Sequence, residues 1–310
     1  MAPTAGPARV PRAHVRVLRE ALLTWFDLEG RALHFRSGGP PEPWAVLVSE
    51  VMAQQTQVGR VDGKWGAFMG RFPTPAALAS APTGDVIRAW RGLGYNRRAI
   101  DLQRAARAIV DAGGEVPRDV ASLEELPGVG PYTARAVAAI AFGQPVGAVD
   151  VNVRRVLGRL LWTGADPLSP RALQAAADAL VDPVRPADWT HAVMDLGATI
   201  CRRARPACAG CPVRAWCAFA SGAVRPTSAE PSRPAVGTRR PVPFAATTRW
   251  LRGRIVEQLC SAPPGTSVAF RGPLGVHPPA AVSAALAALA VEGLVELDGV
   301  DAARLAGERA

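Results

Sequence analysis

The sequence LPGVGPYTA, residues 126–134, lies between two stretches whose apolar residues recur at helical spacing. Gly128 and Gly130 can adopt backbone angles that strain other residues, and they let backbone amides approach a ligand closely. Pro131 suits the first turn of the following helix, where its missing N–H is not needed. The pattern therefore predicts a helix, a tight turn and a second helix within residues 122–143.

This turn also predicts a site for an anion. The first N–H groups of a helix have no partner within the helix, and the positive end of the helix dipole lies beside them. A phosphate of nucleic acid is an anion of the kind that binds there, and such a contact positions a duplex without reading its sequence. An ordinary connection between two helices would contain the same Gly and Pro residues, and this alternative stays open.

The charge of the chain favours a polyanionic partner. The 310 residues carry a formal net charge of +10, which indicates nucleic acid first and an acidic membrane surface second. A preference for Arg explains why Lys64 is the only lysine, but it does not explain the excess of cations over acids. No apolar run is long enough to span a bilayer, and no signal-peptide pattern opens the chain. We therefore expect an intracellular protein of two or three domains.

The pattern along the chain predicts a mainly α fold. Helical periodicity, interrupted by Gly, Pro and Asp, continues almost unbroken over residues 15–221. Residues 1–14 are rich in Pro, Ala and Arg and predict a flexible N-terminus. Residues 222–245 are dense in Pro, Ser and Arg and predict a linker. Two helical stretches and a strand-like end then predict a small winged-helix-like module over residues 246–310.

Four cysteines have the spacing C-x6-C-x2-C-x5-C: they are Cys201, Cys208, Cys211 and Cys217. Closely spaced cysteines in an intracellular chain are metal ligands more often than disulfides. Zinc and a [4Fe–4S] cluster both accept four thiolates. One CxxC with a single cysteine on either side favours the cluster over zinc. Cys260 stands alone in a helical pattern and predicts a core thiol.

Several motifs occur in the order that is typical of one superfamily. LPGVGPYTA, AVDVNVRRVLGR at residues 148–159 and the cysteine spacing together resemble the helix–hairpin–helix DNA glycosylases. With SEVMAQQTQV at 49–58 and WRGLGY at 90–95, the chain is most similar to the MutY family of adenine-mismatch glycosylases. The resemblance covers residues 15–219, about two-thirds of the chain.

The resemblance implies a two-lobed helix–hairpin–helix fold with a [4Fe–4S] cluster as cofactor. A six-helix lobe is expected over about residues 40–148, and a cluster lobe over residues 15–39 together with 149–221. The cluster would shape a basic loop rather than perform the chemistry. The arginines around it that would hold DNA phosphates are Arg202, Arg203, Arg205 and Arg214.

Release of a purine base requires two opposed functions. A general acid protonates a ring nitrogen so that the base leaves neutral, and a carboxylate stabilises the oxocarbenium-like sugar. The resemblance assigns the acid to Glu50, which lies at the edge of the apolar face of a predicted helix. Partial burial there would raise its pKa, as an acid working near neutral pH requires. A boundary Glu that contacts water is the alternative interpretation.

The resemblance places the second carboxylate at Asp150 and an orienting amide at Asn152. An Asp before a helix is also an ordinary N-cap, and Asp150 could serve both roles. Tyr132 stands where relatives with lyase activity carry a lysine that forms a Schiff base with the sugar. A phenol cannot form this bond. The sequence therefore predicts a monofunctional glycosylase that leaves an intact abasic strand.

The target base must be flipped out of the duplex before it can be excised. The resemblance implies that Gln55 enters the base stack as a wedge and that Tyr95 intercalates. The other residues for which it implies contact with DNA or substrate are Arg36, Gln54, Gly128, Gly130 and His191.

Some positions depart from the usual family pattern. His34 and Phe35 replace the Pro and Trp of a common Leu-Pro-Trp-Arg element, Ala53 replaces a Leu, and Asn96 replaces a second Tyr. His191 stands where a Gln or Glu often contributes to the base pocket. The residues after the linker are too few for the Nudix-like domain with which many MutY-like enzymes recognise 8-oxoguanine. These differences concern base specificity more than reaction type.

The sequence therefore predicts a base-excision repair glycosylase that removes adenine mispaired with 8-oxoguanine or guanine. Its expected partner is double-stranded DNA with such a mismatch, and it is expected to act as a monomer without a membrane partner. A cytoplasmic, nucleoid-associated bacterial location fits this function. A thymine or uracil mismatch glycosylase of the same fold is one alternative. A non-catalytic iron–sulfur protein that binds DNA or senses redox state is another.

Overall fold

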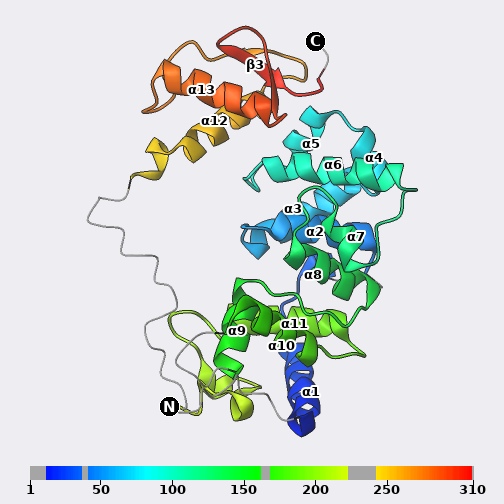
Figure 1. Ribbon diagram of the computed structural model, residues 1–310. Helices are drawn as coiled ribbons and strands as arrows, with labels where there is room; N and C mark the ends of the chain where they lie inside the picture. The colour runs from blue at the N-terminus through cyan, green and yellow to red at the C-terminus, as the bar shows by residue number, and fades with distance from the viewer. Residues whose placement is uncertain (1–11, 37–40, 162–167, 223–241, 309–310) are drawn as a thin grey trace. The chain divides into compact units, whose positions relative to one another are not determined.

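The computed structural model describes residues 12–36, 41–161, 168–222 and 242–308. Helices make up most of these residues, which confirms the mainly α fold class (Figure 1). The N-terminus predicted over residues 1–14 and the linker predicted over 222–245 lie mostly outside the described residues. None of the described helices is both long enough and apolar enough to cross a membrane.

Contacts between residues divide the chain into two units. The first unit consists of Met1–Val46, Arg118–Glu124 and Val129–Gly237. The second consists of Leu47–Pro117, Glu125–Gly128 and Thr238–Ala310. The chain passes from the first unit to the second within helix α2 (Pro43–Ala53). The domain boundaries expected from the sequence stay a prediction, because contacts alone do not show which segments fold independently.

The first unit is built around helix α11 (Pro186–Thr199), whose residues are mostly buried. Three helices pack against it: α1 (Arg12–Glu29), α8 (Pro131–Phe142) and α9 (Val151–Leu161). The remaining helical elements of this unit are η1 (His34–Arg36), α7 (Val120–Glu124), α10 (Pro170–Leu180), η2 (Cys208–Gly210) and η3 (Arg214–Trp216). The predicted helix, turn and helix over residues 122–143 correspond to the end of α7, the turn and α8.

A buried carboxylate fastens the N-terminal segment to α11. Asp195 is 0% exposed and accepts hydrogen bonds from the backbone N–H of Arg31 at 2.9 Å and from the guanidinium groups of Arg31 and Arg36 at 2.6–3.1 Å. Burial opposes ionisation of Asp195, but these hydrogen bonds outweigh it and keep the pKa of the carboxyl below its ordinary value. The segment after α1 therefore depends on one charged side chain of α11.

The second unit contains a group of short helices followed by the C-terminal residues. Besides most of α2, the helices are α3 (Val58–Arg71), α4 (Pro75–Ser80), α5 (Thr83–Ala89) and α6 (Arg97–Asp111). Helix α6 packs against both α4 and α5. It buries one face that includes Ala99, Leu102 and Ala106, each at most 1% exposed.

Residues 244–305 form the α–β–α–β–β order of a winged helix. The elements are η4 (Phe244–Ala246), α12 (Thr248–Ser261), β1 (Val268–Ala269), α13 (Pro279–Val291), β2 (Val295–Leu297) and β3 (Ala302–Leu305). The strands make an antiparallel sheet in the order β1-β3-β2, in which Val295 lies opposite Leu305. The sequence predicted the two helices and one strand-like end, but it missed β1 because two residues are too few for a recognisable alternation.

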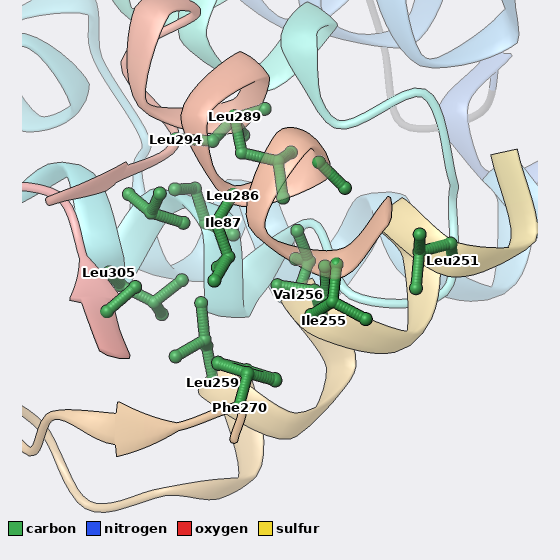
Figure 2. Packing of buried hydrophobic residues seen from close by; sticks show 14 of the residues in the cluster. Ile87, Leu251, Ile255, Val256, Leu259, Phe270, Leu286, Leu289, Leu294 and Leu305 are labelled. Atoms are coloured by element: carbon green, nitrogen blue, oxygen red, sulfur yellow. The ribbon is translucent and has the colours of Figure 1, made fainter. Parts of the chain in front are cut away.

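The C-terminal module shares an apolar core with α5 and α6. Ile87 of α5 and Ile100 of α6 are 1% and 4% exposed, and they belong to the same cluster as Leu259 of α12 and Leu286 of α13. Figure 2 shows Ile87 among the leucines of the module. The module is therefore part of the second unit through its core and not only through the chain that leads to it.

Arg88 of α5 reinforces this packing. Its guanidinium donates to both carboxylate oxygens of Glu308, at 3.0 and 3.1 Å, and to the carbonyl oxygens of Leu259, Cys260 and Ala262 at 2.6–3.3 Å. These carbonyls lie at or just after the end of α12. The last carbonyl oxygens of a helix have no N–H donor within the helix itself. The side chains of Arg88 and Glu308 are only 16% and 5% exposed.

We expect Arg88→Met to weaken the attachment of the module strongly. Loss of one partner leaves the Glu308 carboxylate buried without compensation, which costs about 3–5 kcal/mol. Hydrogen–deuterium exchange over residues 248–305 measures the free energy of local opening, which should fall by this amount. The double variant Arg88→Met/Glu308→Leu should recover part of the loss. Unchanged protection in the single variant would contradict this role of Arg88.

Candidate functional site

Glu50 is a buried carboxyl group on α2. It is 7% exposed, and Leu47, Val51 and Met52 on the same helix are at most 2% exposed. The structure therefore buries this side chain on a helix with a largely apolar buried face, as the sequence led us to expect. The role of Glu50 as an acid stays a prediction.

The loop after α2 presents an exposed glutamine in an unusual conformation. Gln55 has a φ of 54°, in the left-handed region that residues other than glycine rarely occupy. Its side chain is exposed, whereas the amide of the preceding Gln54 donates to the carbonyl of Gly128 at 3.1 Å. The loop thus separates the two glutamines: Gln54 is bound to the hairpin turn, and Gln55 points to solvent.

The loop before α6 contains a second residue of this kind. Tyr95 has a φ of 47° and is 39% exposed. Backbone strain of this type costs on the order of 1–3 kcal/mol and persists only where neighbouring contacts impose it. Among the described residues, Gln55 and Tyr95 are the non-glycine residues with positive φ.

The buried guanidinium of Arg98 imposes both conformations. It donates to the carbonyls of Val51, Met52 and Gln54 at the end of α2, at 2.5–2.9 Å. It also donates to the hydroxyl of Thr56 and to the carbonyl of Gly94, both at 2.9 Å. Burial lowers the pKa of Arg98 to about 10, which still leaves it charged at neutral pH.

Arg98 was missed in the sequence. An Arg on an amphipathic helix normally indicates a solvated face, and no spacing distinguishes one that turns inward. The WRGLGYNRR context of residues 90–98 carries the only hint, because a loop rich in glycine leaves carbonyls that need donors.

The hairpin turn has the geometry that its glycines predict. Gly128 has a φ of 78°, and a Cβ at this position would lie 2.8 Å from the Cβ of Asp101. Gly130 is the N-cap of α8 and supplies no side chain to its first turn. Helix α8 thus begins at Pro131 without a side-chain cap, and contact of its first turn with phosphate stays a prediction.

In the first unit, Asp150 is the N-cap of α9. Its Oδ1 accepts the N–H of Val153 at 2.6 Å, and its Oδ2 accepts the side-chain amide of Asn152 at 2.9 Å. Asp150 therefore caps the N-terminus of a helix, which is the structural role predicted from the sequence. Both carboxylate oxygens are oriented by N–H donors, and the part of Asp150 at the sugar stays a prediction.

Asn152 is itself held by Arg155, a residue that the sequence did not single out. Arg155 donates to Oδ1 of Asn152 at 2.9 Å and to the carbonyls of Gly197 and Cys201 at 2.6 and 2.7 Å. These bonds fix the amide so that its N–H₂ faces Asp150. Because a guanidinium has only N–H donors, the Asn152 atom that faces Arg155 must be the amide oxygen, and the amide nitrogen must then face Asp150.

Tyr132 lies in the first turn of α8, and its hydroxyl is 3.6 Å from the sulfur of Met194 on α11. No amine occupies this position. The absence of lyase activity, which we expect from a tyrosine at this position, stays a prediction.

Arg36 and His191 lie around the buried carboxylate of α11. The side chain of Arg36 is 11% exposed and is paired with Asp195. Burial, together with the neighbouring cationic Arg36 and Arg31, lowers the pKa of His191 to about 3. His191 is therefore neutral at physiological pH, and its contact with a base stays a prediction.

The four cysteines are gathered in and around η2 and η3. Burial, and to a lesser degree the neighbouring thiols of Cys201, Cys208 and Cys217, raise the pKa of Cys211 to about 11. Arg159 donates to the sulfur of Cys201 at 3.4 Å. Among the described residues, no three side chains of His, Cys, Asp or Glu are close enough to hold a single metal ion.

The predicted site residues thus form two groups. Glu50, Gln54, Gln55, Tyr95 and Gly128 belong to the second unit, and Arg98 connects the loops of this group. The first unit contains the other predicted residues: Arg36, Gly130, Tyr132, Asp150, Asn152, His191 and the four cysteines.

The chain is 40% identical over 293 residues to the adenine DNA glycosylase of Mycolicibacterium smegmatis, a match that covers 93% of this chain and 95% of that protein. The chain belongs to the adenine DNA glycosylase family. Residues 48–183 of this family member also match the HhH-GPD superfamily of base excision DNA repair proteins. The resemblance inferred from the motifs is therefore confirmed.

Two further comparisons support the assignment to the adenine DNA glycosylase family. The human adenine DNA glycosylase is 47% identical over 216 residues, which cover 66% of this chain and 40% of the human protein. A solved thermostable thymine-DNA glycosylase superposes with a TM-score of 0.62 at 28% identity and covers 68% of this chain and 98% of that one. The helix–hairpin–helix glycosylase fold is thus shared with an enzyme named for a different base.

We expect Gly197→Ala to disturb the site of this adenine DNA glycosylase family member. A Cβ at Gly197 would lie 2.7 Å from the Cβ of Asn152, so α9 and α11 must separate. Such overpacking costs about 1–3 kcal/mol. Gly158→Ala on α9 is the control, because a Cβ there meets nothing within 4 Å and should stabilise the helix by about 0.5–1 kcal/mol. Chemical denaturation compares the two, and equal effects would refute the close contact.

The stability of the chain should fall in acid partly because of His191. Its folded pKa of about 3 lies below the ordinary value of 6.5, so the folded protein binds fewer protons between these pH values. The contribution of the neutral imidazole is complete above pH 6.5 and declines as the pH falls toward 3.

The variant His191→Gln should therefore lose less stability than the parent between pH 7.5 and 5, by on the order of 1–2 kcal/mol. Denaturant midpoints at the two pH values measure the difference. His14→Gln replaces an exposed histidine and should lose as much as the parent. Parallel curves for His191→Gln and the parent would contradict the prediction.

Proposed function

We propose that the protein is a monofunctional glycosylase that removes adenine mispaired with 8-oxoguanine or guanine. The observation that carries this proposal is a pair of carboxyl groups in contrasting environments within a member of the adenine DNA glycosylase family. Glu50 is buried at 7% exposure, whereas Asp150 is oriented by N–H donors. Cleavage of a glycosidic bond uses two carboxyl groups, one as the acid for the leaving group and one facing the sugar.

In the proposed reaction, the carboxyl of Glu50 donates its proton to a ring nitrogen of the flipped adenine. The bond between that base and C1′ then breaks, and its electron pair leaves with the base. Positive charge develops on the sugar, and the carboxylate of Asp150 stabilises it. Water adds to C1′ and releases a proton, so the products are free adenine and an abasic site in an intact strand.

Asn152 and Arg155 position Asp150 for this step. The amide of Asn152 donates to the carboxylate, and Arg155 keeps the amide in that orientation from its two backbone anchors on the first unit. Arrangement of dipoles before the reaction avoids reorganisation during it, which is a major source of catalytic power.

The absence of an amine at Tyr132 supports a monofunctional reaction. A phenol cannot form a Schiff base with the opened sugar, so strand cleavage would require added alkali. The resemblance places a lysine at this position in relatives with lyase activity.

We further propose that the four cysteines hold a [4Fe–4S] cluster. The donor set fits, because the four thiols lie in one segment and those of Cys211 and Cys217 each interact electrostatically with Cys201 and Cys208. Each thiolate of such a cluster binds a different iron, so the thiols need not converge on one ion. When bound, the cluster would serve to hold the basic loop of residues 201–217 in place. A zinc site is the alternative, and iron and sulfide analysis of the purified protein decides between them.

A second candidate is a thymine or uracil mismatch glycosylase. The similarity to a thermostable thymine-DNA glycosylase favours it, because the two chains share the fold over 68% of this one. The lower sequence identity, 28% against 40–47% for the adenine DNA glycosylases, favours adenine.

The decisive experiment incubates the protein with duplexes that contain A:8-oxoG, A:G, T:G or U:G. We expect strand breaks at the adenine-containing pairs, and only after treatment with alkali. Breaks without alkali would exclude the monofunctional reaction, and excision confined to T:G or U:G would exclude adenine as the target.

We expect Glu50→Gln to reduce the rate of excision by at least about 100-fold, because an amide cannot deliver the proton. Its affinity for the same duplex should change little, since the exchange is nearly isosteric. Glu115→Gln makes the same change of charge at an exposed position and should retain full activity. Single-turnover excision rates provide the comparison, and normal turnover by Glu50→Gln would remove this residue from the acid role.

A further inference from the structure

A groove in the second unit joins the C-terminal module to the two loops described above. It has a volume of about 390 Å³ and is lined mainly by polar atoms. One side is formed by the loop after α2 and the start of α3, another by the Gly92–Asn96 loop, and the third by one face of α12. The family resemblance implies DNA contacts for Gln55 and Tyr95, which line this groove, but it assigns no role to the module.

The groove carries unneutralised positive charge. Three arginines line it: Arg60, Arg91 and Arg249. Arg91 is paired with Glu257, whose pKa this hydrogen bond lowers, so these two charges compensate each other. Among the described residues, no carboxylate lies within ion-pair distance of Arg60 or Arg249. Both are exposed, so they are free to bind an anion from solution.

Arg249 lies against the exposed ring of Tyr95. Its guanidinium carbon is 4.3 Å from the centre of that ring, and the guanidinium of Arg98 is 5.7 Å from the same centre. Cations near aromatic rings strengthen the stacking platforms on which proteins hold nucleotides. Gln55 and Tyr95, the two residues with strained backbones, both line this groove.

The module is held rigidly enough to place Arg249 there. Arg88 binds the end of α12, and Ile87 and Ile100 lie in the core of the module. Arg249 is near the opposite end of the same helix, so its distance from the Tyr95 loop is set by buried contacts rather than by the preceding segment.

We propose that this groove binds the phosphodiester backbone of duplex DNA, with Arg249 of the C-terminal module as a phosphate ligand beside Tyr95. The inference rests on the proposed function for the identity of the nucleic acid. Unpaired guanidinium groups, an exposed aromatic ring and a polar lining together fit a nucleotide chain. The volume also falls in the range of about 300–1,000 Å³ that is usual for ligand sites. The module thus supplies part of the DNA interface.

The test uses a short fluorescein-labelled duplex with only A:T and G:C pairs. Its affinity for the full chain is measured by fluorescence anisotropy between about 50 and 200 mM salt. Loss of one phosphate contact lowers the slope of log K against log salt by about 0.9. We expect this reduction for Arg249→Gln, and little reduction for Arg249→Lys, which retains the charge.

The matched control is Arg254→Gln, an exposed arginine on the same helix that does not line the groove. This variant removes the same charge. Its slope of log K against log salt should stay within about 0.3 of the parent value, which is less than half of the change expected for one phosphate contact. An unchanged slope in Arg249→Gln, or equal reductions in both variants, would overturn the proposal. Thermal melting of Arg249→Gln checks that the fold is retained, as its exposure predicts.

This binding experiment is independent of excision. If no mispaired duplex is cleaved while the slope of Arg249→Gln is reduced, the proposed function fails and the phosphate site stands. If adenine is excised while the slope of Arg249→Gln equals that of the parent, the phosphate site fails and the proposed function stands.

Discussion

The buried guanidinium of Arg98 is the contact on which the second unit depends. It ends α2 by binding the carbonyls of Val51, Met52 and Gln54, and it fixes the loop of Tyr95 through the carbonyl of Gly94. Two loops that are 40 residues apart in the sequence, at Gln55 and Tyr95, are thereby joined to one side chain of α6. Without it, the left-handed conformations of both loop residues would lose the hydrogen bonds that support them.

Other arginines act in the same way. Arg88 binds three carbonyls around the end of α12, Arg155 binds those of Gly197 and Cys201, and Arg159 binds those of Arg202 and Arg203. A guanidinium has five N–H donors in a planar fork, which suits it to clusters of carbonyls that a lysine cannot match. Part of the cationic excess that first suggested nucleic acid therefore stabilises the protein itself. Within the part of the chain that the structure describes, Arg249 makes no such contacts with carbonyls, which is why the phosphate site proposed above is assigned to it.

The sequence predicted features that arise from local geometry or from the family pattern. The turn of residues 126–134, the N-cap at Asp150 and the buried position of Glu50 all depend on neighbours within one or two helical turns. It missed Arg98, Arg155 and the contact of Arg88 with Glu308, because each partner lies far away in the chain and an arginine on a helix carries no sign of inward orientation. The three-stranded sheet was underestimated for a related reason: its strands have two to four residues and are defined by pairing rather than by periodicity.

The core that the C-terminal module shares with α5 and α6 has a consequence for any shortened form of this chain. Removal of residues 248–308 would expose Ile87 and Ile100 to water, next to an Arg88 that has lost its carboxylate and carbonyl acceptors. An apolar patch of this kind promotes self-association. A truncated chain would therefore lose solubility together with the module, and reduced repair by it would reflect aggregation as much as the missing residues.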